Sequence, residues 1–166
     1  FNMTVYLDMD GVIADFFGCL ASKYNVDHWK SIKNINKTLA DIANTTFFYD
    51  IPPFEETEEI VNLVKKYSGG DWGICSSPLR GDEYNSSYWK RTWLVEGNMM
   101  PDDWEKCIFT HTKEKYAISR ITGEPNVLID DKPQNIIEWN AAGGIGILFQ
   151  TSQDDIEYLE AQLEGL

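Results

Sequence analysis

The sequence predicts an α/β protein with a Rossmann-like parallel sheet that is flanked by helices. Short apolar segments, typical of buried strands, alternate along the chain with segments of helical pattern. This alternation favours parallel strands, because a helix is the usual crossover between them. Three of the apolar segments end in acidic or hydroxyl side chains, which is typical of a ligand site at the carboxyl edge of such a sheet.

The predicted strands are short and apolar. They cover residues 4–7, 71–76, 106–110, 127–129 and 146–149.

The predicted helices fill the segments between these strands. The helix within residues 54–68 has the clearest signals, because acidic residues occupy its first turn, Lys65 and Lys66 its last, and Gly69-Gly70 follow. The last helix is predicted to begin at Ser152 as its N-cap, with Ile156, Leu159 and Leu163 on one face. The other predicted helices cover residues 86–96, 113–120 and 133–140.

One segment interrupts this alternation. Residues 17–50 mix helical patterns with aromatic side chains, and Pro52-Pro53 follow them. We therefore expect a small helical cap over 17–50, inserted after the first strand of an α/β core that comprises 1–16 and 51–166. Met3 is the expected natural start, with Phe1 and Asn2 as additions ahead of it.

Composition excludes several classes of partner. The formal charge of −13, with no run of Lys or Arg, argues against polymeric nucleic acid. No stretch of 18 apolar residues and no signal-peptide pattern occurs, so we expect no membrane association. Three cysteines (Cys19, Cys75 and Cys107) without a CxxC pair indicate reduced thiols and a cytoplasmic protein.

The polar strand ends supply the candidate site. Asp8 and Asp10 follow the first strand in the motif DMDG, Ser76 ends the second, and Asp130-Asp131 end the fourth. Each motif alone has an ordinary alternative: DMDG could be an Asx-turn, and Asp131 could cap a helix that starts near Pro133. Together they place four carboxylates in one crevice, where their repulsion favours a divalent cation with hard oxygen ligands, namely Mg²⁺.

At these residues the chain resembles the haloacid dehalogenase (HAD) superfamily of phosphatases. The resemblance rests on DMDGV, on the hydroxyl of Ser76, on Lys90 in the next helix and on the late acidic pair. Within that superfamily the chain is most similar to the 5'(3')-deoxyribonucleotidases, through the segments DMDGVIADF, FFYDIPPFEET, ICSSPL and LIDDKPQN. It departs from them at Ser76, where Thr is usual, at His111, which replaces a basic residue, and over residues 18–46.

The resemblance implies a Mg²⁺-dependent hydrolase that removes phosphate from nucleoside monophosphates. Asp8 would be the nucleophile that forms an aspartyl-phosphate, and Asp10 the general acid and base. The Asp8 carboxylate, the Asp10 carbonyl and Asp131 would hold Mg²⁺, with Asp130 orienting the groups around them. Ser76 and Lys90 would bind the phosphoryl oxygens, helped by the Ser77 backbone.

Aromatic side chains of the cap are candidates for binding a base. We expect Phe16, Phe47 and Phe48 to approach the leaving group and stack on it; the alternative is that they form the core of the cap. Trp29 and Trp89 are expected to be structural, and His111 to lie at the rim of the site. For the oligomeric state, a homodimer is kept as an alternative to a monomer.

Two other functions stay as alternatives. A phosphatase of the same fold could act on another small phosphomonoester, such as a sugar phosphate. A non-catalytic phosphate-binding or phospho-receiver-like domain is more remote, because a receiver has its acidic pair on the first strand, whereas this chain has its pair on the fourth.

Overall fold

The structure is a computed structural model, and it describes residues 3–166. The expectation that Phe1 and Asn2 are additions ahead of a natural start concerns residues outside the described part of the chain.

Five parallel strands form a single sheet in the order β3-β2-β1-β4-β5. This confirms the predicted α/β class and parallel sheet. Leu7 of the central strand lies between Ile74 and Ile129 of its two neighbours, so the carboxyl ends of β1, β2 and β4 meet at one edge. The strands are β1 (Val5–Leu7), β2 (Trp72–Ser76), β3 (Cys107–Phe109), β4 (Val127–Asp130) and β5 (Ile145–Leu148).

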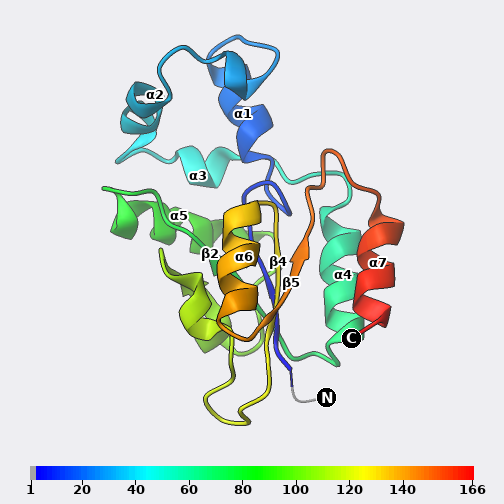
Figure 1. Cartoon of the computed structure of the whole chain (residues 1–166). Coiled ribbons are helices and arrows are strands. Elements are labelled where there is room, and N and C mark those ends of the chain that lie inside the picture. The colour runs from blue at the N-terminus through cyan, green and yellow to red at the C-terminus, as the bar shows by residue number, and fades with distance from the viewer. Residues whose placement is uncertain (1–2) are drawn as a thin grey trace.

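Helices cover both faces of the sheet (Figure 1). On one face, α4 (Thr57–Tyr67) and α7 (Ile156–Glu164) pack side by side. Their apolar side chains join the larger core cluster, which also contains Trp93 and Leu94 of α5 (Glu83–Glu96). On the other face, α6 (Pro133–Ala141) places Ile136 and Trp139 against Tyr6 and Leu128. Proline suits the first turn of α6, because the backbone N–H that it lacks would have no partner in the helix there.

The segment 17–50 lies beyond the carboxyl ends of the strands (Figure 1). It contains most of α1 (Phe16–Lys23), a 3₁₀ turn η1 (Trp29–Ser31), α2 (Ile35–Ile42) and α3 (Phe47–Asp50). The side chain of Asn34 caps α2 by accepting a hydrogen bond from the Lys37 N–H at 3.1 Å. Because α3 packs against α5, the far end of the segment is fixed to the rest of the molecule.

The helix predicted over residues 113–120 is wrong beyond its first turn. The structure has a single 3₁₀ turn, η3 (Lys113–Tyr116), followed by a loop in which Ile118 pairs with Pro125. Gly123 adopts a φ of 73° in this loop. A left-handed glycine and a proline without an N–H favour a tight reversal over a continuing helix.

The start predicted for the last helix is also wrong. α7 begins at Ile156, and Asp155 occupies its N-cap position. The residues before it form a turn in which the Asp154 carboxylate accepts a hydrogen bond from the Gln150 N–H at 2.8 Å. Ser152 lies within this turn and not at the start of the helix, because the Asp154 side chain stabilises the turn as a local acceptor.

Among residues 3–166, no helix has both the length and the apolar character that a bilayer span requires.

Candidate active site

Asp8 lies directly after β1 at the carboxyl edge of the sheet. Its N–H donates to the Ile129 carbonyl at 2.9 Å, which extends the pairing of β1 with β4 by one residue. The side chain is buried, yet it is not isolated, because the Lys113 ammonium lies 2.9 Å from its Oδ1. A buried carboxylate needs such a partner.

Gly11 explains why the acidic strand end turns at a glycine. Its φ of 84° is left-handed, and a Cβ built on it would lie 2.0 Å from Oδ2 of Asp131. The turn closes tightly, because the Met9 carbonyl accepts hydrogen bonds from the N–H groups of Val12, Ile13 and Ala14. Glycine therefore allows the first strand end to approach Asp131 closely.

Lys113 connects two of the carboxylates, and the sequence analysis did not identify it. Its ammonium lies 2.9 Å from Oδ1 of Asp8 and 2.7 Å from Oδ2 of Asp130. Burial alone would lower the pKa of Lys113, but the charges of Asp8 and Asp130 outweigh it and raise the pKa above its ordinary value. Lys113 is therefore a buried cation at neutral pH. A short loop separates Lys113 from the end of β3, at the same edge of the sheet as Asp8, and no motif in the sequence marks this lysine as part of the site.

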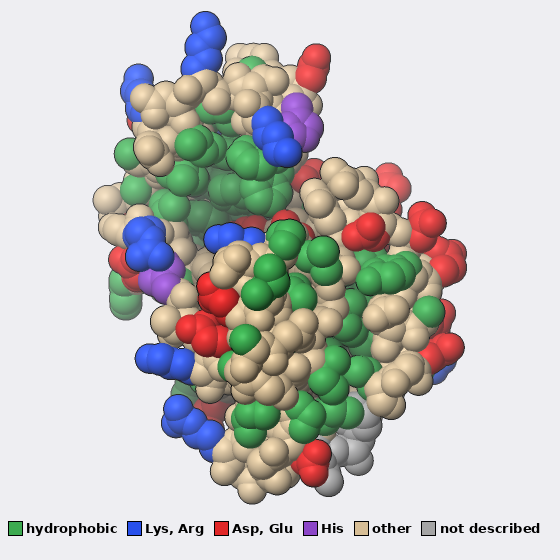
Figure 2. All heavy atoms as spheres, viewed as in Figure 1, with side chains coloured by type: hydrophobic (Ala, Val, Ile, Leu, Met, Phe, Trp, Pro, Cys, Tyr) green, Lys and Arg blue, Asp and Glu red, His purple; other side chains and the backbone are tan. Residues whose placement is uncertain are grey.

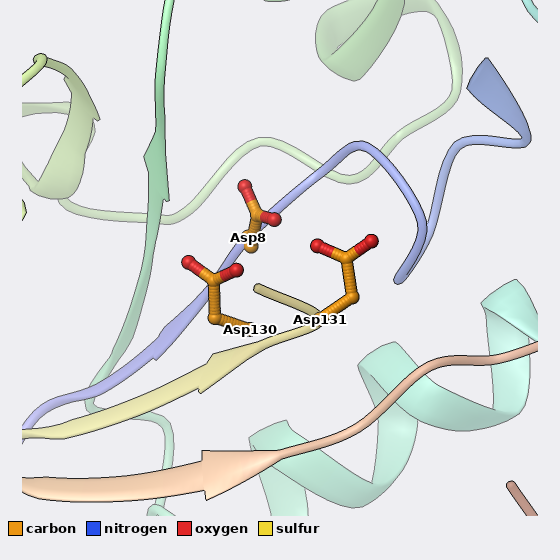
Figure 3. Close-up of side chains that lie close together, drawn as sticks. All are labelled: Asp8, Asp130 and Asp131. Carbon is orange, nitrogen blue, oxygen red and sulfur yellow. The ribbon is translucent and has the colours of Figure 1, made fainter. Parts of the chain in front are cut away.

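The carboxylates of Asp8, Asp130 and Asp131 form a cluster. One oxygen from each lies within 4.8 Å of the others, and all three groups point beyond the ends of β1 and β4 (Figure 3). Burial, reinforced by the other carboxylates, raises the pKa of Asp8 to about 7 and that of Asp131 to about 9. Burial acts on Asp130 in the same direction, but Lys113 and hydrogen bonds from Lys132 and Asn135 outweigh it and lower its pKa.

Asp130 and Asp131 differ in their partners. Both oxygens of Asp130 accept hydrogen bonds: Oδ1 from the Lys132 N–H, and Oδ2 from Lys113 and Asn135. Within residues 3–166, Asp131 has no ion pair with a basic side chain. Asp131 is therefore the member of the pair with lone pairs available to a cation.

Lys90 is held at the next strand end. Its buried ammonium donates to Asp10 Oδ2, Ser76 Oγ and the Ser77 carbonyl, each at 2.9 Å. The structure thus brings together the predicted residues Asp10, Ser76, Ser77 and Lys90. Ser76 is wholly buried beneath this contact.

A cavity of about 640 Å³ opens above the cluster. Figure 2 shows a hollow between the segment 17–50 and the sheet, with acidic side chains at its base and hydrophobic ones above. The residues that line the cavity are Asp8, Asp10, Asp130, Asp131, Lys113, Ser77, Lys132, Pro133, Asn135, Gln150 and Gln153, together with Phe17, His28, Trp29 and Lys30 of the segment 17–50.

The three aromatic residues expected to stack on the leaving group, Phe16, Phe47 and Phe48, are not among those that line the cavity. The rings of Phe16 and Phe48 stack 5.8 Å apart, and Phe47 contacts both edge-on. Phe47 and Phe48 are buried, and the Phe48 ring faces the Lys90 ammonium at 5.1 Å. Phe17 and Trp29 supply the aromatic wall of the cavity instead.

His111 lies outside the cavity lining. Its Nε2 is 3.0 Å from Oε2 of Glu83, at the start of α5. This contact, together with the Gly81 N–H, lowers the pKa of Glu83.

Comparisons with known proteins identify relatives in sequence and in fold. No family model matches the chain. The mitochondrial 5'(3')-deoxyribonucleotidase of Mus musculus is 28% identical over an alignment of 152 residues, and the match covers 79% of this chain and 65% of that protein. The corresponding human protein is 27% identical, with 79% of this chain and 63% of that protein covered. The chain therefore spans a little under two thirds of these relatives.

Solved structures share the fold. A HAD family hydrolase from Deinococcus radiodurans, with bound phosphate and sodium, has a TM-score of 0.57 and 16% identity, with 96% of this chain and 87% of that chain covered. A hydrolase from Streptococcus pneumoniae has a TM-score of 0.53 and 14% identity, with 99% and 100% covered. The resemblance noted in the sequence is confirmed: the chain has the fold of the HAD family hydrolases and is similar in sequence to 5'(3')-deoxyribonucleotidases.

Proposed function

We propose that this protein is a Mg²⁺-dependent phosphomonoesterase that acts on nucleoside monophosphates, deoxyribonucleotides above all. The observation that carries the proposal is the placement of Asp8. Its buried carboxylate is held by Lys113, lies beside Asp131 and borders a cavity large enough for a small organic ligand. Similarity to 5'(3')-deoxyribonucleotidases supports the choice of substrate.

The donor set fits Mg²⁺. Clustered carboxylate oxygens are hard ligands. Burial first, and then the charges of the neighbouring carboxylates, raise the pKa of Asp8 and of Asp131, and a divalent cation would stabilise the ionised form of both groups. Asp8 and Asp131 would hold the ion, and Asp130, which is engaged by Lys113 and Asn135, would orient them. A bound Mg²⁺ would supply charge stabilisation for the transferring phosphoryl group.

Asp8 would be the nucleophile. An oxygen of its carboxylate forms a bond to phosphorus while the ester P–O bond breaks, which yields an aspartyl-phosphate. Lys113 fixes the orientation of this carboxylate through Oδ1 and favours its ionised form. Positioning and charge stabilisation supply most of the rate gain in phosphoryl transfer.

Asp10 would carry the proton. It lines the cavity, and its carboxylate is oriented by Lys90 at 2.9 Å. It protonates the leaving oxygen in the first step. In the second step it takes a proton from the water that attacks phosphorus, and the bond between Asp8 and phosphorus breaks to release phosphate.

Ser76, Ser77 and Lys90 would complete the phosphate subsite. Ser77 borders the cavity, and the contacts of Lys90 with Ser76 and Ser77 fix this strand end. Ser77 is the member of this group that borders the cavity, whereas Ser76 and Lys90 are buried behind it.

The segment 17–50 would act as a cap on the core formed by 1–16 and 51–166. Phe17 and Trp29 border the cavity opposite the carboxylates, so a base attached to the leaving oxygen would meet their rings. Stacking on an aromatic side chain contributes about 1–3 kcal/mol per base. The three free thiols are in keeping with a cytoplasmic location.

The test is phosphate release from deoxyribonucleoside, ribonucleoside and sugar monophosphates, each with Mg²⁺ and with EDTA. The proposal expects metal-dependent release that is fastest for deoxyribonucleotides. Faster release from sugar phosphates would change the proposed class of substrate and leave the proposed mechanism in place. No metal-dependent release from any of them would overturn the proposed function.

A further inference from the structure

A second cavity lies at the opposite edge of the sheet. It has a volume of about 320 Å³ and is bordered by Thr4 and Tyr6 of the β1 region, by Asn126 before β4, and by residues 115–116 and 118–122. The carboxylate cluster lies at the other ends of β1 and β4, so the two cavities are separate.

The lining is basic, although the chain as a whole carries a charge of −13. Lys106, Lys115 and Arg120 border the cavity, and Asp71 is the acidic residue among the described lining residues. Lys106 is already engaged with Asp71 and with Thr4 Oγ1. Lys115 and Arg120 have no ion pair within residues 3–166, so their charges are uncompensated. Figure 2 shows basic side chains at the lower left of the molecule, where this part of the chain lies.

A buried hydroxyl opens on the same cavity. Tyr6 is 5% exposed, and its ring packs edge-on against Trp139. Its hydroxyl has no hydrogen-bond partner among the described residues. Among the described residues, every side-chain oxygen that is fully enclosed has a hydrogen-bond partner. The Tyr6 oxygen has none, so it is not fully enclosed, and the cavity that Tyr6 borders gives access to it. A buried polar group without a protein partner is uncommon, and a bound ligand would satisfy it.

We propose that this cavity binds the phosphoryl group of a small organic phosphate. Lys115 and Arg120 supply positive charge, and the Tyr6 hydroxyl and the remaining Lys106 proton supply donors, which suits an anion with several acceptor oxygens. Arg120 is followed by Ile121, which is 97% exposed, and Ile118 also borders the cavity. These two side chains would contact the carbon part of the ligand.

The test is a titration of the full chain with inorganic phosphate in EDTA, followed by backbone amide shifts in NMR spectra. We expect saturable shifts within residues 115–122. In the double variant Lys115→Ala/Arg120→Ala, the apparent Kd should rise about tenfold or more, because charge-assisted hydrogen bonds are lost. Tyr6→Phe, which keeps the ring against Trp139, should also weaken binding.

Controls separate this site from general charge effects. The double variant Lys33→Ala/Lys37→Ala removes the same charge from exposed positions of the segment 17–50 and should bind phosphate as the unmodified chain does. Equal shifts with chloride at matched ionic strength would overturn the proposal. So would shifts confined to residues 8–11 and 130–132, or an unchanged Kd in Lys115→Ala/Arg120→Ala.

Discussion

The Lys113 ammonium lies 2.9 Å from Oδ1 of Asp8, although 105 residues separate the two in the chain. The sheet order explains this contact: β1 is central, and the chain that leaves β3 passes over the carboxyl edge of the sheet before it enters β4. The same ammonium binds Asp130 at the end of β4. Lys113 therefore links two strand ends and compensates their buried charge.

Replacing Lys113 by Met should destabilise the fold strongly. It would leave Asp8 and Asp130 buried without their cation, and breaking a buried ion pair from one side costs about 3–5 kcal/mol. Urea unfolding of the metal-free protein measures the loss. The matched control is Lys106→Met, whose pair with Asp71 is 30% and 33% exposed and should cost about 1 kcal/mol or less. Equal losses in the two variants would contradict the role given to Lys113.

Replacing Gly11 by Ala should disturb the carboxylate cluster as well as the backbone. The new Cβ would meet Asp131 Oδ2 at 2.0 Å and would sit at a φ of 84°. The control is Gly70→Ala, which has a φ of 87° and no atom within 4 Å of the new Cβ. Backbone strain alone costs roughly 1–2 kcal/mol in either variant. We expect only Gly11→Ala to reduce the Tm gain that Mg²⁺ produces. Equal gains in both variants would argue against the close approach of Gly11 and Asp131.

Metal-free protein should lose stability as the pH rises from about 4 to about 9. The pKa of Asp131 is raised from its ordinary 3.8 to about 9, and that of Asp8 to about 7. In this window the folded state holds more protons than the unfolded state, so the free energy of unfolding falls with pH. Asp131→Asn should remove part of this slope. Its Tm should exceed that of the unmodified chain at pH 8 by several degrees, since about 1 kcal/mol corresponds to 2–4 °C for a domain of this size.

The comparison at pH 4 is the control for this variant. There Asp131 is largely protonated in the folded state, so Asn and Asp should give similar Tm values. A gain of equal size at pH 4 and pH 8 would show that the carboxylate charge is not the cause.

Replacing Trp29 by Ala should raise the KM for nucleoside monophosphates about fivefold or more, because the loss of a stacking surface weakens base binding by about 1–3 kcal/mol. A small alkyl phosphate has no base, so its kcat/KM should change little. Phe48→Leu is the informative comparison, because Phe48 is buried and does not line the cavity. Phe48→Leu should lower the stability of the fold and leave the ratio of the KM for the nucleotide to the KM for the alkyl phosphate unchanged. If Phe48→Leu raised that ratio and Trp29→Ala did not, Phe48 would be the residue that binds the base.

The sheet was predictable because each strand is a short apolar segment between clear helix or turn signals. Four of the site residues could be found for the same reason: Asp8, Asp10, Asp130 and Asp131 lie within three residues of the ends of predicted strands, and parallel pairing brings those ends together. The start of the last helix was missed because both Ser152 and Asp155 are good capping residues, and only the turn made by Asp154 separates them.

The roles of Lys113 and of the aromatic residues that border the cavity, Phe17 and Trp29, became visible only in the structure. Lys113 falls in a segment predicted as a helix that proves to be a single 3₁₀ turn, and nothing in the pattern pointed to a contact with Asp8. Phe16 and Phe17 are adjacent in sequence, and only the packing of α1 decides that Phe17 borders the cavity while Phe16 packs against Phe48. Spacing along the chain carries no information about that choice.

Phosphate release by the unmodified chain and by Asp8→Asn, with deoxyribonucleoside monophosphates and Mg²⁺, tests the central claim most directly. Asn is nearly isosteric with Asp, so far-UV circular dichroism should show that the variant keeps the fold. The account predicts metal-dependent release by the unmodified chain and a loss of roughly a thousandfold or more in Asp8→Asn, because a carboxamide is not a useful nucleophile. Near-normal release by Asp8→Asn would contradict the assignment of Asp8 as the nucleophile.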